Sequence, residues 1–309
     1  MLKFDTSYSY DKVSLRIDLA NYLHIERLPY FMDRLQISIC LYDTNDKCVF
    51  GENINECKSK VIKLPKEKEG YYYLNILTNS GKFGDNLYYP YFQPRSISLV
   101  VNNNNWRFVE SQIYQKNLEA IANLKSDEKA LMYYLRPTSL YNYTEKEIVL
   151  LAQKITMFSV TPMQKLLAIH DWVASNIFYD YDALADRSCD NEEYSAMEVL
   201  KTKKCVCRGY ANLGVALMRA VGIPSFGQRC YALNISSDGG WDRPENQTSS
   251  PNHIIATAYV DNRWVYMDIT WDSNNRYEKG KFIKATRQGI SRKYFDATLA
   301  MISNTHKFF

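Results

Sequence analysis

A cysteine, a histidine and an aspartate follow one another along the chain in an order that suits nucleophilic catalysis. Cys207 comes first, His253 follows, and Asp268 comes shortly after the histidine. A thiol needs a base that takes its proton, and the base needs a partner that fixes its tautomer and orientation. The three residue types therefore predict a triad in which Cys207 is the nucleophile, His253 the base and Asp268 the orienting carboxylate.

The surroundings of Cys207 strengthen this hypothesis. Residues 207–221 predict a slim, buried helix that begins at the cysteine, and Gly222 follows where a helix-ending glycine is expected. The free N–H groups and positive partial charge of a helix N-terminus favour a thiolate, and the same groups can bind an oxyanion. A lone cysteine at such a position is more often a small core residue, so the hypothesis depends on its agreement with the other two residues.

A predicted hairpin brings the histidine and the aspartate together. Strands at 253–260 and 263–270 flank a two-residue turn, Asp261-Asn262. In that register His253 faces residue 270, and Asp268 lies on the same face as His253, diagonal to it. Diagonal neighbours are about 7–8 Å apart at the backbone, which an imidazole and a carboxylate can bridge. A register shifted by one residue would separate them.

The cysteines allow one competing interpretation. Cys205 and Cys207 could bind a metal together with Cys189, Cys230 or His253, but the spacing is not that of a usual zinc site, so neither a metal nor a cofactor is predicted. Seven cysteines cannot all pair, so at least one thiol is free in the monomer. That favours a reducing compartment or a working thiol.

Composition excludes several classes of protein. Hydrophobic residues make up 46% of the 309 and aromatic residues 14%, which is ample for folded cores. The net charge of +4 is spread among mixed signs, so no nucleic-acid partner is predicted. No run of 18 apolar residues predicts a membrane span, and no signal-peptide pattern opens the chain, so a cytoplasmic location is expected.

The pattern along the chain divides it into two predicted domains. Residues 1–112 alternate apolar and polar side chains in short segments, at 13–19, 35–41, 71–77 and 96–100, as in an all-β sandwich. Residues 113–309 read as a mixed catalytic domain with its core at about 160–275. Helices are predicted at 114–135 and 194–200, and after capping boxes at Thr144 and Thr161. The 25 tyrosines are best explained as half-buried sheet residues, although a glycan or protein partner of the first domain remains an alternative.

Three motifs in this order resemble the transglutaminase-like superfamily, particularly its bacterial cysteine-peptidase-like members. In the family, the cysteine is followed by one further residue and then by Gly-Tyr-Ala, at the head of a helix that ends in Gly-Ile-Pro, as in 207–224 here. A histidine strand and an Asp-x-Thr-Trp segment follow, matched by His253 and by 268–271. Upstream, 169–180 resembles the helix and Tyr-Asp element before the family core. Cys205 replaces the glycine that usually stands two residues before the nucleophile, and Ile254-Ile255 replaces Ala-Trp after the histidine.

The resemblance implies an α+β fold with a papain-like core, in which a central helix carrying the cysteine packs on an antiparallel sheet, preceded by an immunoglobulin-like sandwich. It implies acyl transfer through a thioester on a peptide or protein substrate. Hydrolysis of a peptide or amide bond is favoured. Crosslinking of glutamine to an amine is the alternative, and a member that has lost catalysis and serves as an interaction module is another. No calcium-loop pattern is evident.

Overall fold

The computed structural model describes most of the chain, namely residues 7–9, 13–27, 36–45, 47–54, 59–79, 89–90, 97–109, 111–233, 241, 243, 246, 248–285, 290–297 and 299–309. They form two compact units. The first comprises Met1–Tyr114, Leu233–Gln247 and Thr298–Thr305, and the second comprises Gln115–Ala232, Thr248–Ala297 and His306–Phe309. The domain boundary near residue 112 stays a prediction. Two later segments also join the first unit, which a single cut through the sequence does not anticipate.

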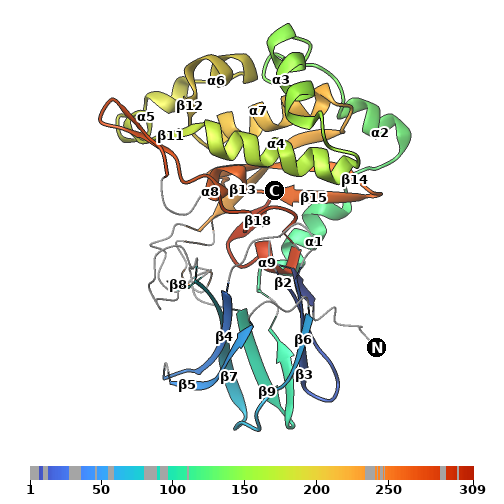
Figure 1. Cartoon of the computed structure of the whole chain (residues 1–309), viewed down its shortest axis with the longest axis vertical. Helices are drawn as coiled ribbons and strands as arrows, with labels where there is room; N and C mark the ends of the chain where they lie inside the picture. Colours follow the sequence, from blue (N-terminus) through green and yellow to red (C-terminus); the bar gives the residue numbers. More distant parts are fainter. Residues whose placement is uncertain are drawn as a thin grey trace. The chain divides into compact units, whose positions relative to one another are not determined.

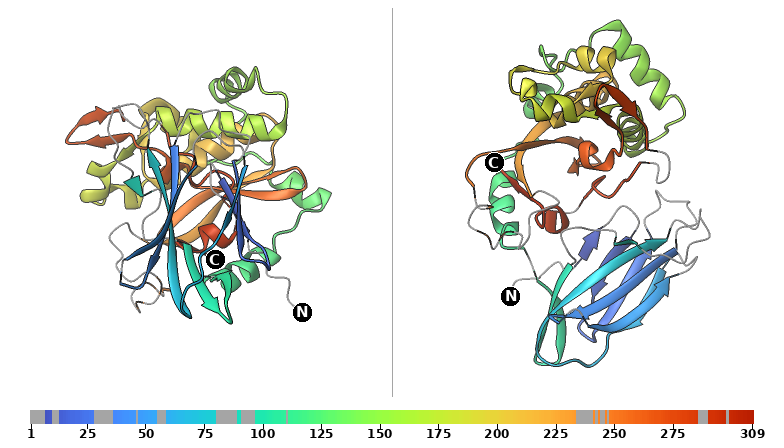
Figure 2. Two further views of the ribbon diagram at one scale, coloured as in Figure 1. Left: turned by 60° about the horizontal axis from the view of Figure 1, so that its bottom comes forward. Right: turned by 90° about the vertical axis from the view of Figure 1, so that its left-hand side faces the viewer.

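The first unit is built from two antiparallel sheets (Figure 2). One sheet has the strand order β1-β2-β3-β6, with β1 (Ser7–Ser9), β2 (Val13–Ile17), β3 (Tyr22–Arg27) and β6 (Ser59–Lys63). The other has the order β10-β9-β7-β4-β5, with β10 (Asn105–Phe108), β9 (Ile97–Asn102), β7 (Gly70–Asn79), β4 (Gln36–Asp43) and β5 (Cys48–Ile54), and β8 (Tyr89–Pro90) pairs with β7.

Alternation along these strands buries one face of each sheet. In β9 every second side chain is buried, and Leu15 and Leu23 of one sheet and Ile39 and Leu74 of the other are almost fully excluded from water. Burying each such side chain contributes about 1.5–3 kcal/mol, which stabilises a shared core between the sheets. The predicted β-sandwich is confirmed.

The second unit carries the helices. They are α1 (Tyr114–Ala122), α2 (Glu128–Tyr133), α3 (Lys146–Thr156), α4 (Pro162–Asn176), α5 (Tyr181–Ala185), the 3₁₀ turn η1 (Ser188–Asn191), α6 (Ala196–Thr202), α7 (Cys207–Ala220) and α8 (Ile269–Asp272). The short helix α9 (Leu299–Ile302) lies in the first unit. None of the helices in the described part of the chain has the length and apolar character needed to cross a bilayer.

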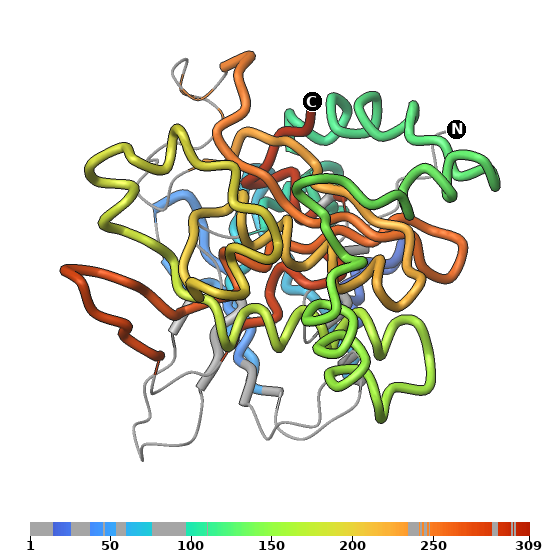
Figure 3. The backbone as a smooth tube through the Cα atoms, turned by 90° about the horizontal axis from the view of Figure 1, so that it is seen from above, coloured from blue at the N-terminus to red at the C-terminus, as the bar shows by residue number. Residues whose placement is uncertain are grey.

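Two four-stranded sheets complete the second unit. The antiparallel one has the order β15-β14-β13-β18, with β15 (Arg263–Met267), β14 (His253–Val260), β13 (Ser225–Ala232) and β18 (His306–Phe308). The other has the order β12-β11-β16-β17, with β12 (Lys204–Cys205), β11 (Phe178–Asp180), β16 (Arg276–Glu278) and β17 (Lys281–Ile283). The β16–β17 hairpin extends as the red loop at the left of Figure 3.

Helix α7 is the centre of this unit (Figure 1). It contacts β13 and β14 of the antiparallel sheet and also α3, α4 and α6, so it is enclosed by the sheet and by helices. Nearly all its side chains from Gly209 to Arg219 are buried. A central helix that starts at the cysteine and packs on an antiparallel sheet is the α+β arrangement predicted for the core.

Three predicted elements differ in detail. The single helix expected at 114–135 is two helices, α1 and α2. The capping box predicted at Thr144 does not form, because the N-cap residue of α3 is Glu145, whose side chain makes no capping hydrogen bond. The box at Thr161 does form, with reciprocal bonds between Thr161 and Gln164. The third difference, the length of the strand expected at 263–270, affects the candidate site directly.

Candidate active site

Cys207 is the first residue of α7, and the backbone before it explains why the helix starts there. Val206 is extended and follows the short strand β12, in which Cys205 pairs with Tyr179 of β11. Gly209 then lets this strand lie against the first turn. A Cβ on Gly209 would fall 2.4 Å from the Cβ of Cys205 and 2.8 Å from a methyl carbon of Val199. The Cys207 side chain remains partly exposed, whereas Cys205 is fully buried.

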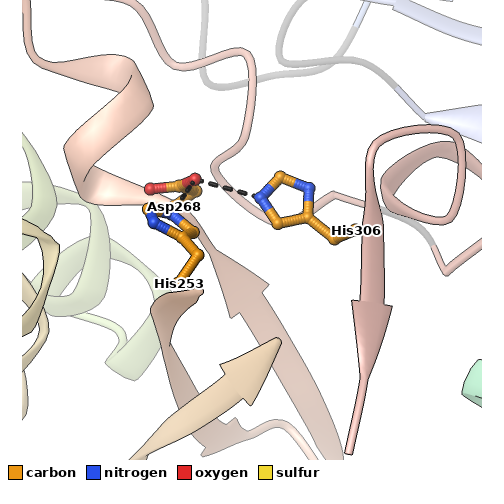
Figure 4. Close-up of side chains that lie close together, drawn as sticks. All are labelled: His253, Asp268 and His306. Atoms are coloured by element: carbon orange, nitrogen blue, oxygen red, sulfur yellow. Dashed lines mark hydrogen bonds and ion pairs between the residues drawn. The ribbon is translucent and has the colours of Figure 1, made fainter. Parts of the chain in front are cut away.

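His253 opens β14, and its side chain is only 8% exposed. Its strand partner is Cys230 of β13, since β15 ends before it could pair with His253. The Nε2 atom of His253 lies 2.8 Å from Oδ2 of Asp268 (Figure 4). The side chain also interacts with Cys207. Because Nε2 is directed at the carboxylate, Nδ1 is the ring nitrogen left to face the thiol.

Asp268 reaches His253 by a route other than the one predicted. The hairpin register is as expected, with Val260 opposite Arg263, and both turn residues at 261–262 have positive φ. The strand expected to continue to residue 270 is wrong, because β15 ends at Met267. Asp268 is instead the N-cap of α8, where its Oδ1 accepts the N–H of Trp271 at 3.0 Å. The cap leaves Oδ2 directed at the imidazole.

The charges of these groups support one another. Burial raises the pKa of the Cys207 thiol, but His253 and the N–H of Ile254 outweigh it, so the pKa lies below its ordinary value. Burial lowers the pKa of His253, but Asp268 and Cys207 outweigh that effect and raise it to about 10. The pKa of Asp268 lies well below its ordinary range despite burial, because His253 and a second histidine, His306, donate to it. The site therefore favours a thiolate–imidazolium pair.

The other nearby cysteines behave in the opposite way. Burial holds the pKa of Cys205 and that of Cys230 well above the ordinary value, so both remain thiols at neutral pH. Among described residues, the group with metal-ligand geometry is His253, Asp268 and His306, whose ligand atoms lie within 4.8 Å of one another. That group contains no cysteine, unlike the cysteine-based zinc set considered from the sequence.

His306 was not predicted as a site residue. It opens β18 and is fully buried, with its Nε2 3.1 Å from Oδ2 of Asp268 (Figure 4). It is distant from Asp268 in sequence and belongs to no motif. No sequence signal identifies it beyond the scarcity of histidine, of which the chain has four.

A second buried network fixes the helix that Asp268 caps. His170 of α4 is fully buried, with Nδ1 3.1 Å from Asp171 and Nε2 3.0 Å from Asp272 of α8. Ionised carboxylates only accept hydrogen bonds, so both nitrogens of His170 carry protons and the ring is an imidazolium. Burial lowers the pKa of His170, but the two carboxylates raise it to about 9. Arg292 also donates to Asp171.

Tyr179 is another neighbour of Cys207 that sequence reasoning did not assign. Strand pairing places it beside Cys205, just before α7 begins. Burial first and then the nearby Cys207 raise the pKa of its hydroxyl well above the ordinary value. The phenol therefore stays protonated, and its O–H remains a hydrogen-bond donor.

Part of this chain is similar to a known protein family and to individual relatives. Residues 150–269 match the model of the Transglutaminase-like superfamily. The mouse protein "Kyphoscoliosis peptidase" is 27% identical over 112 residues, which are 36% of this chain and 16% of that protein. The human protein of the same name is 27% identical over 114 residues, 37% of this chain and 16% of the relative. The match thus spans about one sixth of the length of these relatives.

Among solved structures, one named "Putative Cysteine Protease from Cytophaga hutchinsonii" is similar over 90% of this chain and 81% of its own, with 16% identity and a TM-score of 0.37. The family match covers α7, β13, β14 and β15, and it includes Cys207, His253 and Asp268. The part of this chain that matches the Transglutaminase-like superfamily model is therefore the part that holds the three predicted site residues.

Proposed function

We propose that the protein is a cysteine-dependent acyl transferase that hydrolyses a peptide or amide bond. The observation that carries the proposal is the joint placement of Cys207, His253 and Asp268 at the ends of α7, β14 and β15. The thiol interacts with the imidazole, and the imidazole lies 2.8 Å from the carboxylate. A partly exposed thiol next to an imidazole that is in turn hydrogen-bonded to a buried carboxylate is the arrangement that nucleophilic catalysis requires.

The first half of the proposed reaction forms a thioester. The Cys207 thiolate attacks the carbonyl carbon of the amide, and the C=O electron pair moves to oxygen. His253, held as an imidazolium by Asp268, then gives a proton to the departing nitrogen as the C–N bond breaks. The products are an acyl group on Cys207, a free amine and a neutral imidazole.

The second half regenerates the enzyme. Neutral His253 takes a proton from water while the water oxygen attacks the thioester carbon. The C–S bond breaks, the acid leaves, and the thiolate–imidazolium pair is restored. The N-terminal N–H groups of α7 and the hydroxyl of Tyr179 are the groups proposed to stabilise the oxyanion in both halves.

A labelling experiment tests the nucleophile. Iodoacetamide at pH 7, with mass-spectrometric readout for each cysteine, is expected to modify Cys207 faster than Cys48, which is exposed and serves as an internal reference. A His253→Ala variant should slow the Cys207 reaction and leave the Cys48 reaction unchanged. Labelling of Cys207 no faster than Cys48 would reject the proposal.

A second experiment separates hydrolysis from transamidation. A library of glutamine-containing and ordinary peptides is incubated with the protein and a labelled primary amine. Release of acid or cleaved peptide with little amine incorporation supports hydrolysis, while dominant incorporation would assign crosslinking instead. A Tyr179→Phe variant should lower turnover of whichever product forms, because it removes the proposed oxyanion donor and keeps the ring. A Cys207→Ala variant with full biological activity would favour a non-catalytic module.

A further inference from the structure

The carboxylate of Asp268 accepts more hydrogen bonds than a simple triad requires. Its Oδ1 accepts the N–H of Trp271, and its Oδ2 lies 2.8 Å from Nε2 of His253 and 3.1 Å from Nε2 of His306. A carboxylate with a low pKa only accepts, so both imidazoles carry a proton on Nε2. One oxygen is therefore held from two sides.

His306 is fixed more firmly than a side chain on a short terminal strand would be by itself. Strand β18 pairs with β13, with His306 opposite Ala232. The imidazole packs against the ring of Trp271, with centroids 4.7 Å apart, and against Tyr294 at 5.6 Å. The side chain is fully buried. Its N–H thus reaches Asp268 from a rigid position.

We propose that His306 is a positioning residue, which holds the Asp268 carboxylate in the orientation that aligns His253 with Cys207. This inference rests on the catalytic role proposed above for those three residues. Its hydrogen bond is to the Asp268 carboxylate, and its ring lies 5.7 Å from that of His253, so it acts on the base and on the carboxylate that orients the base.

The local charges explain why one extra donor matters. The groups that face Asp268 are His253 from β14, His306 from β18, and the thiols of Cys207 from α7 and Cys230 from β13. Cys230 stays neutral, so the two imidazoles are the side-chain donors that compensate the buried carboxylate. Without His306, Oδ2 keeps His253 as its side-chain partner, so the carboxylate turns more freely about its Cβ–Cγ bond and both of its oxygens shift. The alignment of His253 is then lost.

The same three side chains could in principle bind a metal ion, and the hydrogen-bond geometry favours positioning. Separations of 2.8 and 3.1 Å are those of N–H···O bonds, which use the Nε2 proton. A metal would need the lone pairs of both Nε2 atoms instead. Chelation therefore distinguishes the two roles: labelling of Cys207 unchanged by EDTA and by added Zn²⁺ supports positioning, and a rate that either reagent changes overturns it.

Three substitutions of His306 test the proposal with iodoacetamide as the probe, between pH 5.5 and pH 9. His306→Phe keeps a ring without a donor and should slow labelling of Cys207 at pH 7 about tenfold, the effect of losing one charge-assisted hydrogen bond. His306→Gln places an amide N–H where Nε2 lies and should restore most of the rate. His306→Asn, whose amide is too short to reach Oδ2, should behave like His306→Phe. If the phenylalanine variant does not fold, the glutamine–asparagine pair carries the test.

A double-mutant comparison excludes a merely structural role. In an Asp268→Asn background, His306→Phe should slow labelling no further, because the residue acts through the carboxylate. An equal slowing in both backgrounds, or a His306→Phe rate at or above that of the unmodified protein, would overturn the inference.

The control variant, His24→Gln, breaks a His–Asp contact of 2.8 Å in the first unit and should leave the rate of Cys207 labelling unchanged. If Cys207 of the unmodified protein labels no faster than Cys48, the proposed function itself fails, which is a separate result.

Discussion

Replacement of His170 by glutamine is expected to remove a pH dependence from the stability of the second unit. His170 is a buried imidazolium between Asp171 and Asp272, and the pKa is raised from 6.5 to about 9. Glutamine can still donate toward Asp272 but does not titrate. The groups that face the ring are those two carboxylates, Arg292 beyond Asp171, and the ring of Phe295.

The magnitude follows from proton linkage. Between pH 6.5 and 9 the folded state keeps the His170 proton and the unfolded state loses it, so the free energy of unfolding falls as pH rises. The slope is about 1.4 kcal/mol per pH unit, and over this window it amounts to about 3 kcal/mol. This stabilisation is complete below pH 6.5 and is lost as pH passes through about 9.

The assay is urea unfolding at pH 6, 7, 8 and 9, followed by hydrogen–deuterium exchange of peptides from α4 and α8, so that the second unit is read by itself. The unmodified protein should lose stability relative to His170→Gln across the series, and the subtraction removes the contribution of other groups such as His253. Parallel curves for the two proteins would refute the buried imidazolium. The control, His24→Gln, removes a partly exposed pair and should cost less than about 1 kcal/mol.

Further tests address packing and acid–base chemistry. Gly214→Ala places a methyl group 2.7 Å from Cδ1 of Ile269 and should lower the free energy of unfolding in urea by about 1–3 kcal/mol. A Gly214→Ala/Ile269→Val protein should recover that stability, because valine lacks the Cδ1 carbon. No recovery would contradict the packing argument. Asp268→Asn should slow turnover of any peptide substrate and raise the pH at which Cys207 begins to label, since it removes the charge that holds His253 protonated; an unchanged profile would contradict this. For the unmodified protein, kcat/KM should decline above about pH 10 as His253 loses the proton it gives to the leaving group, and a decline that begins near pH 7 would contradict the raised pKa.

Much of the fold follows from local patterns in the sequence. The sandwich strands were readable because their apolar residues alternate, and α7 because small residues lie between a helix start and Gly222. The helix predicted at 114–135 was wrong as one element, because α1 ends at Ala122 and Asp127 caps a second helix, its carboxylate accepting the N–H of Ala130. The capping box at Thr144 failed because Ser/Thr-x-x-Glu/Gln patterns permit a cap without requiring one.

The candidate site shows where such reasoning stops. The register of the predicted hairpin placed His253 and Asp268 on one face of the sheet. The structure has that register as far as Met267. The alternation of side chains along a strand could not show that the chain turns into α8 after Met267. The contact between His253 and Asp268 therefore arises from a helix cap, which the sequence pattern did not predict. His306 at the site and Arg292 in the His170 network could not be found, because each reaches its partner through long-range packing that leaves no periodic trace.

The path of the chain between Asp268 and His306 bears on how the protein could be divided. After Ala297 the chain contributes Thr298–Thr305 to the first unit and only then returns with His306 as the start of β18. A fragment limited to the family segment, 150–269, would lose β18, leave the edge of β13 unpaired and lack both His306 and Arg292. The stretch that sequence families recognise is therefore smaller than the piece of polypeptide that can fold around Cys207.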